Sequence, residues 1–220
     1  MISLIKKISV KIFPSFSIKA KAFKRLILNK ESYLYSTGYM ESLKRDMVCN
    51  EKGDGVPWIN FAALGVITPR LKKDFVVFEF GSGNSTNYFA DRVNQIVSLE
   101  YDKQWFDFVK ERLHKNVELI FKEYDIDGDY CRAIKDTGKK YDLVIVDGRD
   151  RVNCVKKGLD CLTDRGVLIL DDSQRNRYAS AIQHAKSFGF KSLYIEGLKS
   201  GGVKPDGTTI FYRNGNCLDL

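Results

Sequence analysis

The stretch of this sequence best suited to binding chemistry runs from residue 75 to residue 86. It reads F-V-V-F-E-F-G-S-G-N-S-T, an apolar run with one acid, then two glycines and three small polar residues. A run of β-branched and aromatic residues is typical of a strand that is buried on both faces. Gly81 and Gly83 permit backbone conformations that a side chain would forbid, and they let a ligand lie close to the main chain. The stretch therefore predicts a strand that leads into a nucleotide-binding turn, with Ser85 or Thr86 able to cap the helix that follows.

This turn departs from the dinucleotide fingerprint G-x-G-x-x-G, because Thr86 stands in place of the third glycine. In that fingerprint the third glycine lets the helix lie close to a pyrophosphate. Glu79 lies two residues before the first glycine instead. The pattern E-x-G-x-G, followed by hydroxylated residues, resembles motif I of the class I S-adenosylmethionine-dependent methyltransferases. The resemblance implies that Glu79 holds the methionine ammonium group, usually through water. It also implies that Gly81 and Gly83 pass under the methionine and ribose, with Ser85 and Thr86 in the same cofactor-binding turn.

Two further positions at predicted strand ends could hold a nucleoside cofactor. Glu100 ends the second predicted strand, seventeen residues after Gly83, where an acid can accept hydrogen bonds from both ribose hydroxyls. After the third strand, the resemblance places Glu123 at the adenine amino group and Tyr124 beside the adenine ring. Three aspartates crowd the same loop, so a shift of two to four residues in the predicted strand end would move this assignment.

Three carboxylates, Asp147, Asp171 and Asp172, follow the fourth and fifth predicted strands. The carboxyl ends of parallel strands share one edge of a sheet, so we expect these side chains to converge near the reactive end of the cofactor. One of them could act as a general base, with a pKa raised by its neighbours. Alternatively, the three could bind a divalent cation such as Mg²⁺ that orients paired hydroxyls. The third alternative is structural, with Asp150 and Asp172 capping helices.

The spacing of these acids resembles the metal site of the catechol-type and caffeoyl-type O-methyltransferases. In that family an acid ends the fourth strand, and an acid and an amide end the fifth. Asp172 stands here in place of the amide. Four arginines flank the acids, and they could either neutralise them or bind an anionic substrate such as a sugar phosphate or a uronate: Arg149, Arg151, Arg175 and Arg177.

Strands and helices alternate regularly after the glycine turn, which predicts a parallel sheet with right-handed crossovers. The final two predicted strands are instead separated by a loop rich in Gly, Lys and Pro, residues 197–207, so the last strand is expected to pair antiparallel. We therefore predict an α/β fold, a Rossmann-like seven-stranded, mostly parallel sheet with one antiparallel strand near its edge. The helices are predicted at residues 87–92, 103–114, 129–135, 151–162 and 176–188, and the later strands at 95–100, 117–122, 141–147, 166–170, 191–196 and 208–213.

The net charge of +8 is concentrated in residues 1–30, which contain eight basic residues and no acid, so the other 28 basic residues balance the 28 acidic ones. We predict a basic amphipathic arm over residues 1–30, a helical lid or linker over 31–56, and a Rossmann-like methyltransferase domain over 57–220. Leu4, Ile5, Ile8 and Ile12 share one side of a helical projection of the arm. Such a helix could lie on an anionic membrane surface or pack on its own domain.

The sequence also limits the compartment and the partners. Five cysteines form no C-x-x-C pair, and lysines interrupt each apolar stretch of the arm before it reaches the length of a secretory signal. These features predict reduced thiols in the cytoplasm, with the arm able to hold the protein at the inner face of the membrane. No R-G repeat, zinc spacing or base-stacking motif accompanies the basic arm, so we expect no nucleic-acid partner. The sequence indicates no oligomeric state.

Five motifs occur in order, namely P-W near residue 57, E-F-G-S-G-N-S-T, S-L-E-Y-D, Y-D-L-V-I-V-D-G-R-D-R and L-I-L-D-D-S. The combination covers about residues 33–213 and resembles the bacterial class I methyltransferases of surface-polysaccharide and glycan modification. The resemblance implies methyl transfer from S-adenosylmethionine, with O-methylation of a sugar or glycan hydroxyl, lipid-linked or anionic. Two other classes stay open. An NAD-dependent oxidoreductase is disfavoured by Glu79, by the missing third glycine and by the lack of room for a second domain. A non-catalytic cofactor-binding or scaffold protein is disfavoured by the strand-end acids.

Overall fold

The chain divides into two compact units at the junction of Asp54 and Gly55, and the computed structural model describes residues 14–220. In the first unit, α2 (Pro14–Leu26) precedes two short helices, α3 (Tyr33–Ser36) and α4 (Tyr39–Arg45). The predicted apolar side of the arm, from Leu4 to Ile12, lies outside the described residues. The predicted division of the chain into arm, lid and domain stays a prediction.

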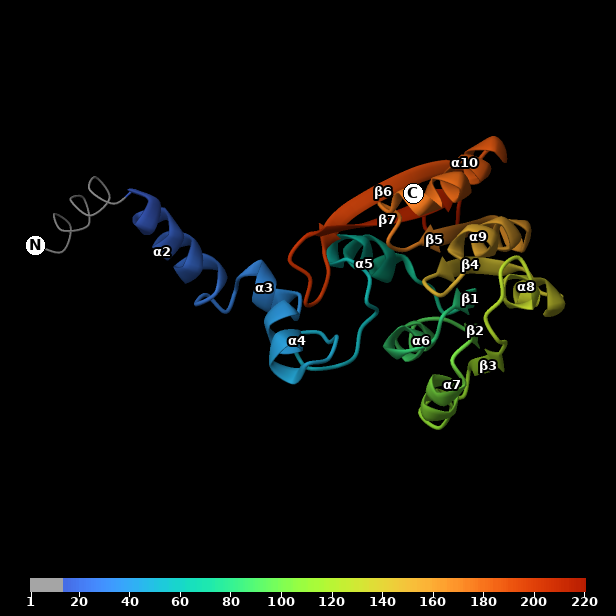
Figure 1. Ribbon diagram of the computed structural model, residues 1–220, viewed down its shortest axis with the longest axis horizontal. Coiled ribbons are helices and arrows are strands. Elements are labelled where there is room, and N and C mark those ends of the chain that lie inside the picture. The colour runs from blue at the N-terminus through green and yellow to red at the C-terminus, as the bar shows by residue number, and fades with distance from the viewer. Residues whose placement is uncertain (1–13) are drawn as a thin grey trace, which may run out of the picture. The chain divides into compact units, whose positions relative to one another are not determined.

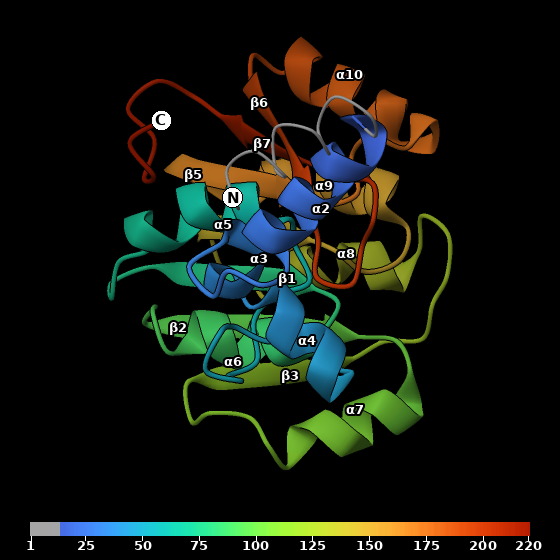
Figure 2. The ribbon, with the colours of Figure 1, turned by 90° about the vertical axis from the view of Figure 1, so that its left-hand side faces the viewer.

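The second unit is built on a seven-stranded sheet with the strand order β3-β2-β1-β4-β5-β7-β6 (Figures 1 and 2). Every neighbouring pair from β3 to β5 is parallel, whereas β7 runs antiparallel to both β5 and β6. The predicted fold, including its antiparallel strand near the edge, is confirmed. The strands are β1 (Val76–Phe80), β2 (Gln95–Glu100), β3 (Val117–Phe121), β4 (Tyr141–Val146), β5 (Leu162–Leu170), β6 (Lys191–Leu198) and β7 (Pro205–Tyr212).

Helices cover both faces of this sheet. Phe78 and Phe80 of β1 point into a core shared with α8, α9 and α10, whereas Val77 points into a second core with α5 and α6. Figure 1 shows the two groups on opposite sides of the sheet. Burial on both faces explains why the central strands are mostly apolar instead of alternating. The helices are α5 (Phe61–Ile67), α6 (Asn84–Ala90), α7 (Lys103–Lys110), α8 (Asp129–Asp136), α9 (Arg151–Asp160) and α10 (Ala179–Ser187), with short 3₁₀ helices at Thr68–Arg70 and Asn176–Tyr178.

The helix after the glycine turn begins at Asn84, three residues before its predicted start. Gly83 is the residue that precedes the helix, and its N–H donates to Thr86 Oγ1 at 3.1 Å. Thr86 and Ser85 therefore lie in the first helical turn, and the prediction that one of them occupies the capping position is wrong. The helix can begin earlier than predicted because the Thr86 hydroxyl, which lies within the helix, accepts a hydrogen bond from the free N–H group of Gly83.

All five cysteines are unpaired and buried, as the absence of close cysteine pairs in the sequence indicates. Among residues 14–220, no helix is both long enough and apolar enough to cross a bilayer.

Candidate active site

Glu79 anchors the glycine turn from inside the sheet. Its side chain is buried, and its Oε2 accepts hydrogen bonds from Thr86 Oγ1 at 2.6 Å and from Ser98 Oγ at 2.8 Å. These bonds connect the end of β1 to β2 and to the first turn of α6. Burial raises the pKa of Glu79 to about 7, although hydrogen bonds from Ser85, Thr86 and Ser98 oppose the rise. Glu79 thus fixes the shape of the turn, and its contact with a cofactor stays a prediction.

The two glycines of the turn serve different purposes. Gly81 has a φ of +98°, and a Cβ added there would lie 3.1 Å from the main chain of Gly148 at the end of β4. Gly83 has an extended φ of 166°, which any residue can adopt. A Cβ at Gly83 would meet only Trp105, at 4.0 Å. Gly81 is therefore required by the fold, whereas the space above Gly83 is open and suits a ligand that lies against the backbone.

Glu100 lies at the end of β2 and is nearly buried, but its carboxylate lines a cavity. Its Oε2 accepts hydrogen bonds from Ser82 N at 3.1 Å and Ser82 Oγ at 2.7 Å. Its Oε1 accepts from the N–H groups of Tyr101 and Asp102, at 2.8 and 2.9 Å. Groups of the protein therefore already donate hydrogen bonds to both carboxylate oxygens of Glu100. Of these donors, the Ser82 hydroxyl can rotate away, so a ribose hydroxyl could replace it.

A cavity of about 400 Å³ lies where strand order reverses between β1 and β4. Such a switch point at the carboxyl ends of parallel strands is the usual ligand site in open α/β sheets. Sequence reasoning missed three of its lining residues, although they follow the end of β2 and could have been found from that position. The cavity is lined by Gly81, Ser82, Glu100, Asp147, Gly148, Arg149 and Arg151 together with the missed Tyr101, Asp102 and Trp105.

The loop after β3 places the two predicted adenine residues differently. Glu123 is exposed, whereas the half-exposed Tyr124 lies with its ring centroid 6.3 Å from that of Tyr101 and lines a second cavity. The neighbouring Asp125 accepts hydrogen bonds from the N–H groups of Asp129 and Tyr130, at the start of α8. The adenine assignments of Glu123 and Tyr124 stay predictions.

Asp147, Asp171 and Asp172 come together at the ends of β4 and β5, with ligand atoms within 4.8 Å of one another. They differ in exposure, since 33% of the Asp147 side chain is accessible, against 7% for Asp172 and none for Asp171. Asp147 also lines the cavity beside the glycine turn. It is therefore the carboxylate of the three that is best placed to face a ligand.

Arg151, at the start of α9, holds the two strand ends together. Its guanidinium donates to the main-chain oxygens of Asp147 at 2.9 Å, Gly148 at 3.0 Å and Asp171 at 2.7 Å. It also forms ion pairs with Asp147 Oδ1 at 2.8 Å and Asp172 Oδ2 at 3.1 Å. The planar fork of arginine suits this task, because a single point charge could not serve so many oxygens.

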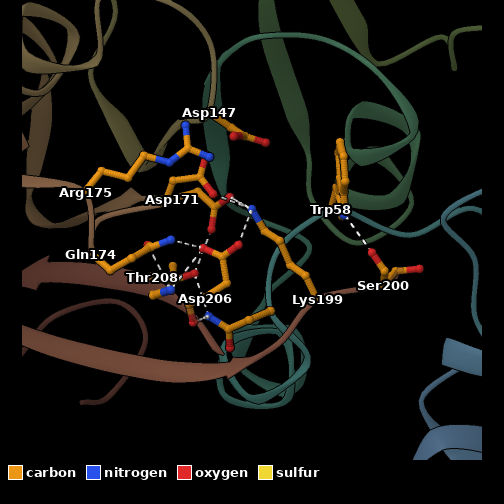
Figure 3. Close-up of polar contacts among 12 residues, drawn as sticks. Trp58, Asp147, Asp171, Gln174, Arg175, Lys199, Ser200, Asp206 and Thr208 are labelled. Carbon is orange, nitrogen blue, oxygen red and sulfur yellow. Dashed lines mark hydrogen bonds and ion pairs between the residues drawn. The ribbon is translucent and has the colours of Figure 1, made fainter. Parts of the chain in front are cut away.

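A second cation, Lys199, reaches the same acids from the loop after β6 (Figure 3). Its Nζ lies 2.6 Å from Asp171 Oδ2 and 2.8 Å from Asp172 Oδ1. The sequence predicted that Lys199 lies in the loop over residues 197–207, and no role was predicted for it. Because β6 runs in the same direction as β5, its carboxyl end lies at the active edge of the sheet, and this topology is the signal that identifies Lys199.

The pKa values of the three acids diverge for physical reasons. The packed surroundings and the neighbouring Asp171 raise the pKa of Asp147 to about 7, and Arg151 opposes the rise. Burial likewise raises the pKa of Asp171, against the pull of Lys199. Burial also opposes ionisation of Asp172, but Lys199 and the arginines beside it outweigh burial and lower its pKa. Such divergence is typical of sites that move protons.

The predicted divalent-cation site does not fit these surroundings. Asp171 Oδ1 accepts a hydrogen bond from Thr208 at 2.8 Å, and its Oδ2 binds Lys199. Asp172 Oδ1 also binds Lys199, and its Oδ2 lies 3.1 Å from Arg151 and 2.9 Å from Arg175. A cation such as Mg²⁺ requires several oxygen ligands at about 2.1 Å, and it could obtain them only by displacing cations that the protein already holds there.

Neither a family model nor a curated protein matches this chain, but solved structures do. A putative O-methyltransferase from Klebsiella pneumoniae has a TM-score of 0.54 and 17% identity, and the match covers 90% of this chain and 97% of that one. An rRNA methylase from Streptococcus thermophilus has a TM-score of 0.54 and 16% identity, covering 69% and 93%. A precorrin-6y C5,15-methyltransferase from Geobacter metallireducens has a TM-score of 0.50 and 17% identity, covering 68% and 86%.

The chain has the class I methyltransferase fold. This finding agrees with the resemblance seen in motif I and with a cavity at the switch point of the sheet. At these identities the likeness establishes the fold alone, so the chemistry has to be inferred from the residues of the site.

Gly81→Ala and Gly83→Ala form a matched pair that tests the two glycine roles. We expect Gly81→Ala to lower the free energy of unfolding by about 1–3 kcal/mol, because alanine is strained at positive φ. Gly83→Ala should leave unfolding within about 0.5 kcal/mol of wild type and weaken S-adenosylhomocysteine binding about tenfold or more. Urea denaturation and calorimetry measure the two quantities. Unchanged ligand affinity in folded Gly83→Ala would contradict the assignment of Gly83 to the cofactor.

Proposed function

We propose that this protein is an S-adenosylmethionine-dependent O-methyltransferase. The observation that carries the proposal is the single cavity that brings the glycine turn, Glu100 and Asp147 together in a methyltransferase fold. When bound, S-adenosylmethionine supplies a methyl group made electrophilic by a sulfonium sulfur. The protein must then bind this donor, orient an acceptor beside it and remove a proton.

Residues of the turn and of the loop after β2 would hold the donor. The open backbone at Gly83 gives room for it, and Glu100 can exchange its bond from the Ser82 hydroxyl for a bond from a ribose hydroxyl. Trp105 closes one side of the cavity, with its indole N–H fixed on Ser82 O at 2.9 Å. Tyr101 is held in place by a 2.9 Å hydrogen bond between its hydroxyl and Arg149. These rigid aromatic walls suit a nucleoside.

Asp147 is the proposed general base. It is the most accessible of the three carboxylates, and it lines the donor cavity with its Oδ1 paired to Arg151, whereas both oxygens of Asp171 and of Asp172 are bound by other groups of the protein. Asp147 would take the hydroxyl proton of the acceptor as the acceptor oxygen bonds to the methyl carbon, and the methyl–sulfur bond would break to leave a neutral thioether, S-adenosylhomocysteine. Of the three predicted catalytic residues, Asp171 and Asp172 would then act by fixing the cations beside Asp147.

A second cavity, of about 290 Å³, would receive the acceptor. It shares Gly148, Arg149 and Arg151 with the donor cavity, so a molecule bound there lies next to the donor. Arg175 and Arg177 also line it, and Asp150 is the one acid in its lining. This excess of guanidinium groups favours an acceptor with a carboxylate or phosphate. We therefore propose the hydroxyl of an anionic sugar or glycan, such as a uronate or a sugar phosphate, as the methylated group.

Asp147→Asn tests the base while keeping the shape of the side chain. We expect turnover with an accepted sugar to fall by about a hundredfold or more, with S-adenosylhomocysteine affinity within about threefold of wild type. Radiolabelled methyl transfer to a panel of uronates and sugar phosphates measures turnover, and calorimetry measures affinity. Full turnover by Asp147→Asn would eliminate Asp147 as the base.

The pH profile provides a separate test. The base must be ionised, and the pKa of Asp147 is raised to about 7, so kcat should rise with pH and level off above that value. At pH 5 the rate should be about a hundredth of its plateau, since each unit below the pKa costs about tenfold. The residual activity of Asp147→Asn should lack this step. A wild-type profile that is flat between pH 5 and 8 would contradict the assignment.

We also propose that residues 1–30 hold the protein on the cytoplasmic face of an anionic membrane. In the described part of this arm, Phe16 and Phe23 lie seven residues apart on α2 and are 73% and 55% exposed. The helix carries no acid in its first turn and has Lys24 and Arg25 in its last. Each basic residue near an anionic surface contributes up to about 1 kcal/mol, and the exposed rings add apolar contact.

The full-length double variant Phe16→Ser/Phe23→Ser tests this membrane role. We expect wild type to float with vesicles containing an anionic phospholipid at low salt, to float less as salt rises, and to stay behind with neutral phosphatidylcholine vesicles. The double variant should float several-fold less, because it loses the apolar part of the contact. Equal flotation of the two proteins on anionic vesicles would show that α2 does not insert.

A further inference from the structure

Contacts on several sides hold the Lys199 side chain beside Asp171 and Asp172. The residue is 8% exposed, and its neighbour Ser200 accepts a 3.0 Å hydrogen bond from the indole N–H of Trp58. The Lys199 ammonium lies 5.8 Å from the centre of the Trp58 ring and 3.7 Å from Asp206 Oδ2. Figure 3 shows its side chain extended between Trp58 and the acids. Lys199 is therefore a fixed cation, unlike a mobile lysine on a surface loop.

Asn60 forms hydrogen bonds with both strands that flank this loop, β6 and β7. Its side-chain amide donates to Thr208 Oγ1 at 2.9 Å and to the main-chain oxygens of Ile195 and Asp206, at 3.1 and 3.2 Å. Thr208 in turn donates to Asp171 Oδ1 at 2.8 Å. The hairpin of β6 and β7 thus reaches Asp171 from one side through Thr208 and from another through Lys199.

We propose that the Lys199 ammonium occupies the position of a divalent cation, so that this methyltransferase works without a metal ion. Asp147, Asp171 and Asp172 present oxygens within 4.8 Å of one another, which is an arrangement able to bind a metal. Lys199 binds two of these acids and Arg151 binds two, so the cluster is neutralised by the chain itself. Lys199 is a positioning residue here: it holds Asp171 and Asp172 and leaves Asp147 to face the acceptor.

Loss of the Lys199 ammonium should change metal binding whether or not the protein is catalytic. Removing the ammonium would expose Asp171 Oδ2 and Asp172 Oδ1 beside Asp147, and hard carboxylate oxygens are the ligands that Mg²⁺ and Mn²⁺ prefer. Lys199→Ala should therefore create a metal site where wild type has none. Only the catalytic half of the inference, the independence of turnover from metal, rests on the proposed methyltransferase function.

Manganese binding tests the first half directly. Electron paramagnetic resonance titration with Mn²⁺ should show no stoichiometric binding by wild type and one bound ion per chain in Lys199→Ala, at least tenfold tighter than any binding by wild type. Lys199→Ala/Asp171→Asn should lose the new site. Lys199→Met, which keeps most of the side-chain volume, should also bind Mn²⁺. It replaces Lys199→Ala in the titration if the alanine variant does not fold. One tightly bound Mn²⁺ in wild type, or none in either folded single variant, would overturn the proposal.

Turnover tests the second half. Wild-type turnover should be unchanged by EDTA, whereas Lys199→Met should lose kcat with little change in S-adenosylhomocysteine affinity and should regain part of it with Mn²⁺. Turnover of wild type that EDTA abolishes and Mg²⁺ restores would overturn the inference. Failure of wild type to bind S-adenosylhomocysteine would instead refute the proposed function, and the manganese result would still decide whether Lys199 occupies a cation site.

Discussion

Neutralisation of three crowded carboxylates at the ends of β4 and β5 is the interaction on which the rest of the site depends. Two of these acids are almost fully buried, and buried like charges are costly unless cations and hydrogen bonds compensate them. Arg151 supplies one cation from α9, and Lys199 supplies another from the end of β6. The bonds of Arg151 join the ends of β4 and β5, and those of Lys199 join β5 to the antiparallel hairpin, so the electrostatic balance also fixes the edge of the cavity.

The sequence predicted the parts of the site that follow from local patterns. An apolar strand, a glycine turn and acids after strand ends can be recognised because each occupies a few consecutive residues. Lys199 could not be recognised in this way, because it meets Asp171 across 28 residues of chain. The residue pattern also showed three potential metal ligands and the arginines beside them, Arg151 and Arg175, which do pair with the acids, but it did not show Lys199. The start of α6 was misplaced for a similar reason, since Thr86 bonds from within the helix and does not precede it.

The structure also refines the roles that the family resemblance implies for acids. The resemblance implies that Glu79 and Glu100 contact a donor, but both carboxylates accept hydrogen bonds mainly from the protein's own N–H and O–H groups. Each acid therefore shapes the backbone that a donor would touch. The open space above Gly83 and the aromatic wall at Trp105 complete that surface. A binding site of this kind is preorganised, and its shape depends on residues that need not contact the ligand.

The proposed catalytic roles all require that the cavity between the glycine turn and Asp147 binds S-adenosylmethionine, and that is the claim to test first. Isothermal titration calorimetry of the full-length protein with S-adenosylhomocysteine and with NAD, under the same conditions, tests that claim most directly. We predict one bound S-adenosylhomocysteine per chain and no detectable heat from NAD, because Thr86 replaces the glycine that a pyrophosphate needs. Stoichiometric binding of NAD with no binding of S-adenosylhomocysteine would contradict the account.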